Sequence, residues 1–229
     1  MGKGMDSLNE EKKQRKQSAF SQQLAIKQKE EKLARIRFIT NYEDCASGWF
    51  HSIPKIGRLG KPFAELIYCM RQKDEECEYC NNPKTMAVKD KYFFWVWVHE
   101  KLHFKPDENR EWEKVEYLGE YYYLEPINKF QYLMTGPGFN DGIKNKFKQW
   151  FLRFKKTLLD RDYDWCREGF DLNTDYDLIP RDEKPTKLAK EIEEGAKELQ
   201  PIDSVMELMM PIKLGKDKEE GSNDEEDLF

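Results

Sequence analysis

The chain contains 229 residues, of which 36% are charged and 38% hydrophobic, and it carries a formal net charge of −5. This length allows one sizeable core with appendages, or at most two small domains. No run of roughly 18 apolar residues occurs, and the first residues lack an apolar stretch, which argues against a membrane-spanning helix and a secretory signal; we expect a cytosolic protein.

Charge is unevenly distributed along the chain. Residues 1–37 contain ten Lys and Arg against five Asp and Glu, residues 215–229 contain two against seven, and the middle holds 27 against 32. Because the middle is mildly acidic, any surface that binds nucleic acid must be basic only locally.

The N-terminal residues 1–36 are rich in Lys, Glu and Gln, which predicts a partly helical basic arm. From Arg35 to Thr40 polar and apolar residues alternate, as in a half-buried strand. We therefore expect a core at 37–180 and helices at 181–214 packed on it. The arm could contact DNA or an acidic surface of a neighbouring copy, and its cations include Lys12, Lys13, Arg15 and Lys16.

Strand signals then follow one another with few helical signals between them. Glycine-rich stretches at 57–60 and 136–138 separate several of them as turns. Short strands of this kind are typical of an antiparallel sandwich or a small barrel. The expected strands are 49–56, 62–70, 92–99, 116–124, 130–134 and 175–179.

Three cysteines and one histidine have the spacing of a structural metal site. Cys77 and Cys80 form a C-x-x-C unit, from which two thiolates can reach one tetrahedral ion. Cys69 is the nearest third ligand, and His51, on a preceding strand, is the expected fourth. Four protein ligands predict one structural Zn²⁺ in a subdomain at about 49–90. The alternatives for the fourth ligand are Cys45, Cys166 and His99.

A different interpretation of the same residues needs no metal. Cys69 would then be a buried thiol of the core, and Cys77 and Cys80 a redox pair or an incidental one. The zinc interpretation is preferred because disulfides are rare in a cytosolic protein and five cysteines cannot pair completely within one chain.

Residues 92–98 are apolar on both faces of the expected strand. If the even-numbered residues face the core, then Phe93, Trp95 and Trp97 lie on the opposite face, where exposed rings could stack on unpaired bases. The alternative is a strand buried on both faces, with the helix expected at 143–158 as its cover.

Two further segments are candidates for the same surface. The run Tyr121-Tyr122-Tyr123 places at least one ring on each face of its strand, and Tyr121 and Tyr123 are the candidates for stacking. A basic turn could hold phosphates beside the rings, or be an ordinary solvated turn; its cations are Lys55, Arg58 and Lys61.

The segment His99-Glu100-Lys101-Leu102-His103 matches the H-E-x-x-H pattern of zinc peptidases. That chemistry requires a helix, because only there do the two histidines converge on one ion. Here β-formers precede the segment and Pro106 follows it, so we expect a strand, with the histidines roughly 13 Å apart at about 3.3 Å per residue. A peptidase is therefore an alternative, but the least favoured one.

Helical spacing appears at 143–158, where Phe147, Phe151 and Leu158 share one face. The opposite face is basic, which is typical of a solvated surface more often than of a phosphate-binding one. Its cations are Lys144, Lys146, Lys148, Arg153, Lys155 and Lys156. Further helices are expected at 188–199 and from Ser204 onward.

The last residues, 215–229, are acidic and low in hydrophobic residues, so we expect a disordered tail. A terminal ring could enter a pocket on a partner while the acids meet Lys and Arg around it. The tail could instead fold back over the protein's own DNA groove, or only aid solubility. The residues concerned are Asp224, Glu225, Glu226, Asp227, Leu228 and Phe229.

With these features, the chain resembles the zinc-containing helix-destabilising proteins of tailed bacteriophages, which bind single-stranded DNA. The ligand order His51, Cys69, Cys77, Cys80 matches that family, and Arg15-Lys16-Gln17-Ser18 loosely matches its arm motif. The acidic ending in Phe229 is similar to the tails of other single-strand binders. The chain departs from the family in a longer interval between His51 and Cys69 and in its mildly acidic middle.

The resemblance implies a mainly β fold: an oligonucleotide/oligosaccharide-binding (OB) antiparallel barrel with an inserted zinc subdomain, flanking helices and two tails. It implies a non-enzymatic protein in the cytoplasm of an infected bacterium, which coats single-stranded DNA during phage replication, recombination and repair. The tail would recruit replication and recombination proteins, and the arm would support self-association along DNA. A second hypothesis is a zinc-stabilised adaptor that binds proteins without DNA.

Overall fold

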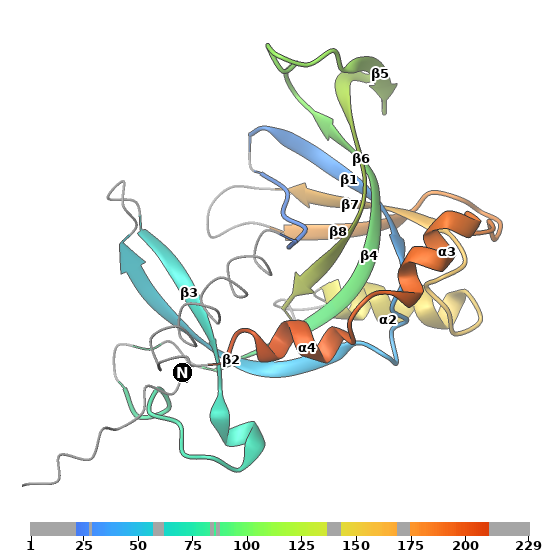
Figure 1. Cartoon of the computed structure of the whole chain (residues 1–229). Coiled ribbons are helices and arrows are strands. Elements are labelled where there is room, and N and C mark those ends of the chain that lie inside the picture. The colour runs from blue at the N-terminus through green and yellow to red at the C-terminus, as the bar shows by residue number, and fades with distance from the viewer. Residues whose placement is uncertain are drawn as a thin grey trace, which may run out of the picture.

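The computed structural model describes residues 22–27, 29–56, 62–82, 85, 88–136, 143–168 and 175–210. These residues form a mainly antiparallel sheet with few helices (Figure 1). The strands are β1 (Glu31–Phe38), β2 (Ala46–Ile56), β3 (Pro62–Tyr68), β4 (Lys89–His103), β5 (Glu113–Tyr117), β6 (Glu120–Thr135), β7 (Asp162–Glu168) and β8 (Asp175–Pro180). The helices are η1 (Met70–Lys73), α2 (Ile143–Arg153), α3 (Lys190–Lys197) and α4 (Ile202–Glu207).

The sheet is open and is organised around the long strand β4. Its order is β3-β2-β4-β1-β7-β8, while β6 pairs with both β4 and β5. The first part of β4 pairs with β2, as in Ala46↔Phe93, and the later part pairs with β1, as in Phe38↔Val96. Both β4 and β6 curve strongly along their length (Figure 1).

One face of the sheet packs against α2. The even-numbered residues Phe94, Val96 and Val98 of β4 join Phe147 and Phe151 of the helix in one buried cluster. The ring of Phe38, at the end of β1, lies within this cluster. The Phe38 ring makes edge-on contacts with Phe94, Phe147 and Tyr163, at centroid distances of 5.6, 5.5 and 5.4 Å.

The opposite face is covered by α4. Phe93 and Trp95 of β4 share a second buried cluster with Val205 and Met206 of this helix. Close packing is possible because Gly48 of β2 has no side chain; a Cβ there would lie 2.8 Å from the Met206 sulfur. Residues 93–96 are therefore buried on both faces, as the alternative interpretation held, but the helix that covers Phe93 and Trp95 is α4 rather than the one at 143–158.

The folded part begins earlier than expected. Strand β1 starts at Glu31, and Leu24 and Ile26 are buried with 3% exposure each. The Leu24 N–H donates to the Tyr132 carbonyl of β6 at 2.8 Å. The expected arm boundary at residue 36 therefore lies too late, because β1, the bridge at Gln23 and the buried Leu24 and Ile26 all precede it.

Two strand assignments also differ from expectation. β7 was not among the expected strands, although its acids Asp162 and Asp164 alternate with the buried rings of Tyr163 and Trp165. The strand expected at 116–124 instead spans the end of β5, a turn and the start of β6, and the strand expected at 130–134 is the later part of the same long β6. Among the helices of the described residues, none is long and apolar enough to cross a membrane.

Candidate metal centre

His51, Cys69, Cys77 and Cys80 come together in one compact cluster beside the β2–β3 hairpin. Their ligand atoms all lie within 4.8 Å of one another, and three of the four residues are buried. His51 Nε2 lies 3.4 Å from Cys77 Sγ and 3.5 Å from Cys80 Sγ, and the Cys69 and Cys80 sulfurs are 3.6 Å apart. A tetrahedron with metal–sulfur bonds of about 2.3 Å has edges of about 3.8 Å, so the cluster could hold a metal ion.

Local backbone geometry places each ligand. His51 pairs with Ile67 across the hairpin, and the Cys69 N–H donates to the Trp49 carbonyl at 2.8 Å. The chain then turns through η1 and reverses at Asp74, which has φ of 56°. The Cys80 N–H donates to the Cys77 carbonyl at 3.1 Å, which closes the C-x-x-C turn.

The protonation of the cluster suits a metal site. Burial, and then the charge of Arg71, lower the pKa of His51, so the imidazole is neutral and can donate a lone pair. Burial raises the pKa of Cys69 to about 11. Burial alone would also raise the pKa of Cys77, but hydrogen bonds with the backbone of Met70 and Tyr79 outweigh it and lower that pKa. Metal binding would therefore have to displace the proton of the Cys69 thiol.

The remaining cysteines and histidines lie elsewhere. All five cysteines are free thiols in the structure. In the part of the chain that the structure describes, one group of three or more side chains could hold a metal ion, and it is the group that contains His51. It does not include the alternative fourth ligands Cys45, Cys166 and His99.

The H-E-x-x-H segment lies in strand β4, as predicted. Its histidines contact different acids: His99 Nε2 lies 3.5 Å from Asp162, and His103 Nε2 lies 3.0 Å from Glu125. The His103 ring also stacks on Trp112 at 4.2 Å between centroids. The helical convergence that the peptidase pattern requires is absent from this strand.

The expectation that Phe93 and Trp95 face outward is wrong. Phe93 is fully buried and Trp95 is 7% exposed, because α4 packs over them. The Trp95 indole N–H also donates to the Gln200 carbonyl at 2.9 Å. Trp97, on the same face, is half-buried and contacts the Phe130 ring edge-on at 4.9 Å.

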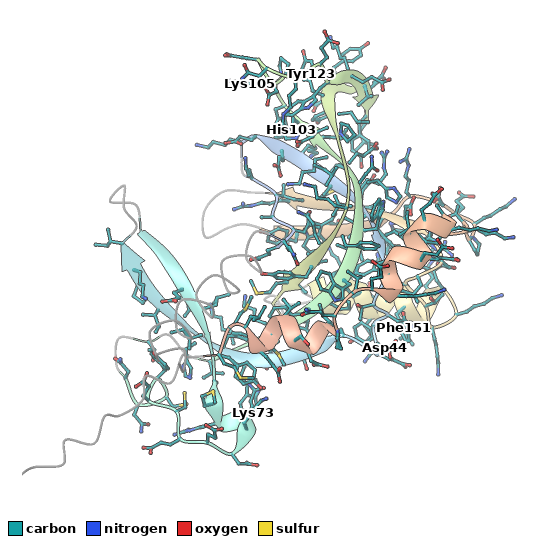
Figure 2. The ribbon with its side chains drawn as sticks, viewed as in Figure 1. Asp44, Lys73, His103, Lys105, Tyr123 and Phe151 are labelled. Atoms are coloured by element: carbon teal, nitrogen blue, oxygen red, sulfur yellow. The ribbon has the colours of Figure 1, made fainter. Side chains whose placement is uncertain are left out.

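Tyr121 and Tyr123 lie near the end of the β5–β6 hairpin, and Figure 2 shows Tyr123 there with His103 and Lys105. Tyr121 is 62% exposed and the Lys114 ammonium lies 4.4 Å from its ring centroid, while Tyr123 is half-buried. Residues 104–125 contain seven acidic residues against three basic ones. The rings are accessible, but their surroundings repel phosphates.

Of the predicted cations, Lys55 is exposed at the end of β2 and forms an ion pair with Glu65. The other predicted cations of the turn and the arm lie outside the described residues, as do the tail residues. These are Arg58, Lys61, Lys12, Lys13, Arg15, Lys16, Asp224, Glu225, Glu226, Asp227, Leu228 and Phe229.

Sequence reasoning missed an exposed indole beside the metal cluster. Trp49 of β2 is 48% exposed, whereas its neighbours Gly48 and Phe50 are buried. Its carbonyl accepts hydrogen bonds from the Cys69 backbone and the Gln72 side chain, so the backbone beneath the ring is fixed to the cluster. The alternation of residues 46–50 could have revealed this ring, because it puts Trp49 opposite the buried Phe50.

No family model, curated protein or solved structure matches this chain.

Proposed function

We propose that the chain is a non-enzymatic single-stranded-DNA-binding protein with one structural Zn²⁺, which acts in phage replication, recombination and repair in the cytoplasm of an infected bacterium. The observation that carries the proposal is the cluster of His51, Cys69, Cys77 and Cys80 in a mainly antiparallel β protein. The order of these ligands resembles that of the phage helix-destabilising proteins.

Zinc is favoured over other metals by the ligand set. Three thiolates and one imidazole are soft to borderline donors, and a closed set of four protein ligands is typical of structural zinc. The ion would connect β2, the end of β3 and the charged loop between Cys69 and Cys80. In this role the metal fixes the loop and takes no part in a reaction.

The OB-type barrel belongs to the same proposal. Its support is the bend of β4, which pairs with β2 over its first part and β1 over its later part, as in a sheet that begins to close. The curvature of β4 and β6 also supports a barrel-like sheet (Figure 1). The open order of the described strands would make it an opened variant.

An exposed ring would hold a base. With Phe93 and Trp95 buried and the surroundings of Tyr121 and Tyr123 acidic, we propose Trp49 as the stacking residue and Lys55 as a phosphate contact near the basic turn. The Trp49 indole is exposed on a backbone that hydrogen bonds fix to the metal loop.

The partners of the two ends belong to the proposal as well. The acidic tail that ends in Leu228 and Phe229 would recruit replication and recombination proteins through its ring and its charges. The basic arm would support self-association along DNA. Neither segment is among the described residues.

Titration of the zinc-loaded full chain with a fluorescein-labelled oligothymidylate tests the function. We expect micromolar or tighter binding, weaker binding to duplex, and a linear fall of log affinity with log salt concentration. Absence of single-strand binding, or binding with no salt dependence, would contradict the proposal and leave the adaptor as the better explanation.

Replacing Trp49 by alanine should weaken oligonucleotide binding by roughly 1–3 kcal/mol, because each stacked base contributes about that much. The melting temperature should change little, since almost half of the side chain is solvent-exposed. Fluorescence anisotropy measures the affinity. Phe104→Ala is the matched control, because this ring is 45% exposed and not proposed to stack; equal effects of both substitutions would argue against a specific role for Trp49.

A further inference from the structure

Helix α2 and the turn after it concentrate positive charge in an otherwise acidic chain. Residues 143–161 contain seven Lys and Arg against one Asp, although the whole chain carries −5. Such local excess is what a protein with an acidic average needs in order to attract a polyanion.

The packing of α2 directs its cations outward. Phe147 and Phe151 are buried in the core, which leaves Lys148, Leu152 and Arg153 on the exposed side of the helix. Leu152 is 57% exposed. The helix is also fixed to β8 by a hydrogen bond from the Trp150 indole to the Leu178 carbonyl, 2.8 Å long.

The turn after α2 presents two more cations on a fixed backbone. Lys155 and Lys156 have φ values of 58° and 64°, in the left-handed region. The Lys156 N–H donates to the Phe151 carbonyl at 2.8 Å, and the Lys156 carbonyl accepts from the Asn41 side chain at 3.3 Å. The backbone is thus held before any ligand binds, which lowers the entropy cost of binding.

Only some of the cations in this segment have an acidic partner among the described residues. Lys146 is paired with Asp177 at 2.9 Å, and Arg161 with Asp160 at 2.9 Å. Four exposed cations are left without an ion pair among the described residues: Lys148, Arg153, Lys155 and Lys156.

The aromatic rings beside these cations contact one another and two arginines. The Trp150 and Phe154 rings stack at 5.5 Å, and the Arg153 guanidinium lies 5.1 Å from the Trp150 centroid. The Arg161 guanidinium lies 3.4 Å from the Phe154 centroid. An acidic peptide that ends in a phenylalanine needs a pocket for its ring, whereas a phosphate backbone needs only accessible cations.

We propose that the exposed side of α2, together with the Lys155–Lys156 turn, binds the phosphate backbone of nucleic acid. This inference rests on the proposed function and adds the surface that supplies its electrostatic part. The surface would hold the strand irrespective of sequence, because phosphate contacts carry no base information.

The test compares two triple variants of the zinc-loaded full chain. K148Q/K155Q/K156Q removes three proposed contacts, and K129Q/K184Q/K187Q removes three exposed lysines elsewhere, for the same change in net charge. The probe is fluorescein-labelled oligothymidylate, titrated across a salt series. With about 0.7 counterions released per single-strand phosphate contact, the first variant should lose about 2 from the log–log slope and about 100-fold in affinity at 0.1 M salt.

The control variant should keep nearly the wild-type slope, and circular dichroism should show both variants folded. Equal slopes for the two variants, with wild-type binding intact, would overturn this surface but leave the proposed function standing. Failure of the wild type to bind would instead reject the function. A loss that disappears when residues 222–229 are deleted would also overturn the inference, because the tail would then be the occupant.

Discussion

Cys77→Ser should release the metal and unfold the region around the β2–β3 hairpin. Cys77 is 4% exposed and contacts the His51 imidazole. It belongs to the second core cluster, together with Cys69 and Met206. Structural zinc contributes on the order of 10 kcal/mol to the folding of small zinc domains. Loss of one of four ligands should therefore lower the melting temperature by far more than a surface substitution.

Atomic absorption on the purified variant, together with a thermal melt, measures both parts of this expectation. Cys45→Ser is the matched control, because Cys45 is only partly buried and does not belong to the cluster. A Cys77→Ser protein that keeps one equivalent of zinc and melts like the control would show that the ligand assignment is wrong.

Arg37→Met should destabilise the protein by about 2–4 kcal/mol, because it leaves the partly buried Asp162 without its arginine and the Leu159 and Thr186 carbonyls without their donor. Arg37 is 2% exposed and donates to Asp162, to the Leu159 carbonyl and to Thr186, at distances of 2.5 to 3.1 Å. These bonds join β1 to β7 and to the chain that leads to α3. Urea unfolding gives the free energy of unfolding directly.

Two further variants define what Arg37 contributes. Lys146→Met breaks the more exposed pair with Asp177 and should cost at most about 1 kcal/mol. Asp162→Asn in the Arg37→Met background should recover part of the loss, because it removes a carboxylate charge that has lost its arginine. If Arg37→Met costs no more than Lys146→Met, the Arg37–Asp162 pair is not important for stability.

The same pair predicts how stability depends on pH. Burial alone would raise the pKa of Asp162, but its bonds and charge interactions with His99 and Arg37 outweigh burial and lower the pKa below its ordinary value of 3.8. The stabilisation that the Asp162 carboxylate contributes is therefore complete above a pH of about 4, and it is lost as the pH falls through the lowered pKa of this group. Urea unfolding between pH 5 and 2 should show a smaller acid loss in Asp162→Asn than in the wild type; parallel curves would contradict the coupling.

The metal ligands could be predicted from the sequence because their geometry is mostly local. The C-x-x-C turn needs only four residues, and His51 reaches the cluster through one hairpin in which it pairs with Ile67. The helix at α2 and the strand nature of the H-E-x-x-H segment were also predictable, since each follows from periodicity and from β-formers before Pro106.

Other features depend on contacts between distant segments, which periodicity does not specify. Residues 92–98 are apolar on both faces, but only the packing of α4, over a hundred residues later, decides that Trp95 is buried while Trp49 is not. The alternation of acids with Tyr163 and Trp165 could have revealed β7, but the ion pairs that its acids make with Arg35 and Arg37 of β1 come from a segment over a hundred residues earlier.

Two sheet edges are closed by segments close to the ends of the described chain. Residues 22–24 form a parallel bridge with Tyr132 at the edge of β6, and the Tyr68 N–H of β3 donates to the Met209 carbonyl. Unpaired strand edges are templates for aggregation, so these segments also guard against it. Shortened versions of the protein made for crystallisation should therefore retain residues 22 to 210, since trimming further would uncover backbone that can recruit the strands of other molecules.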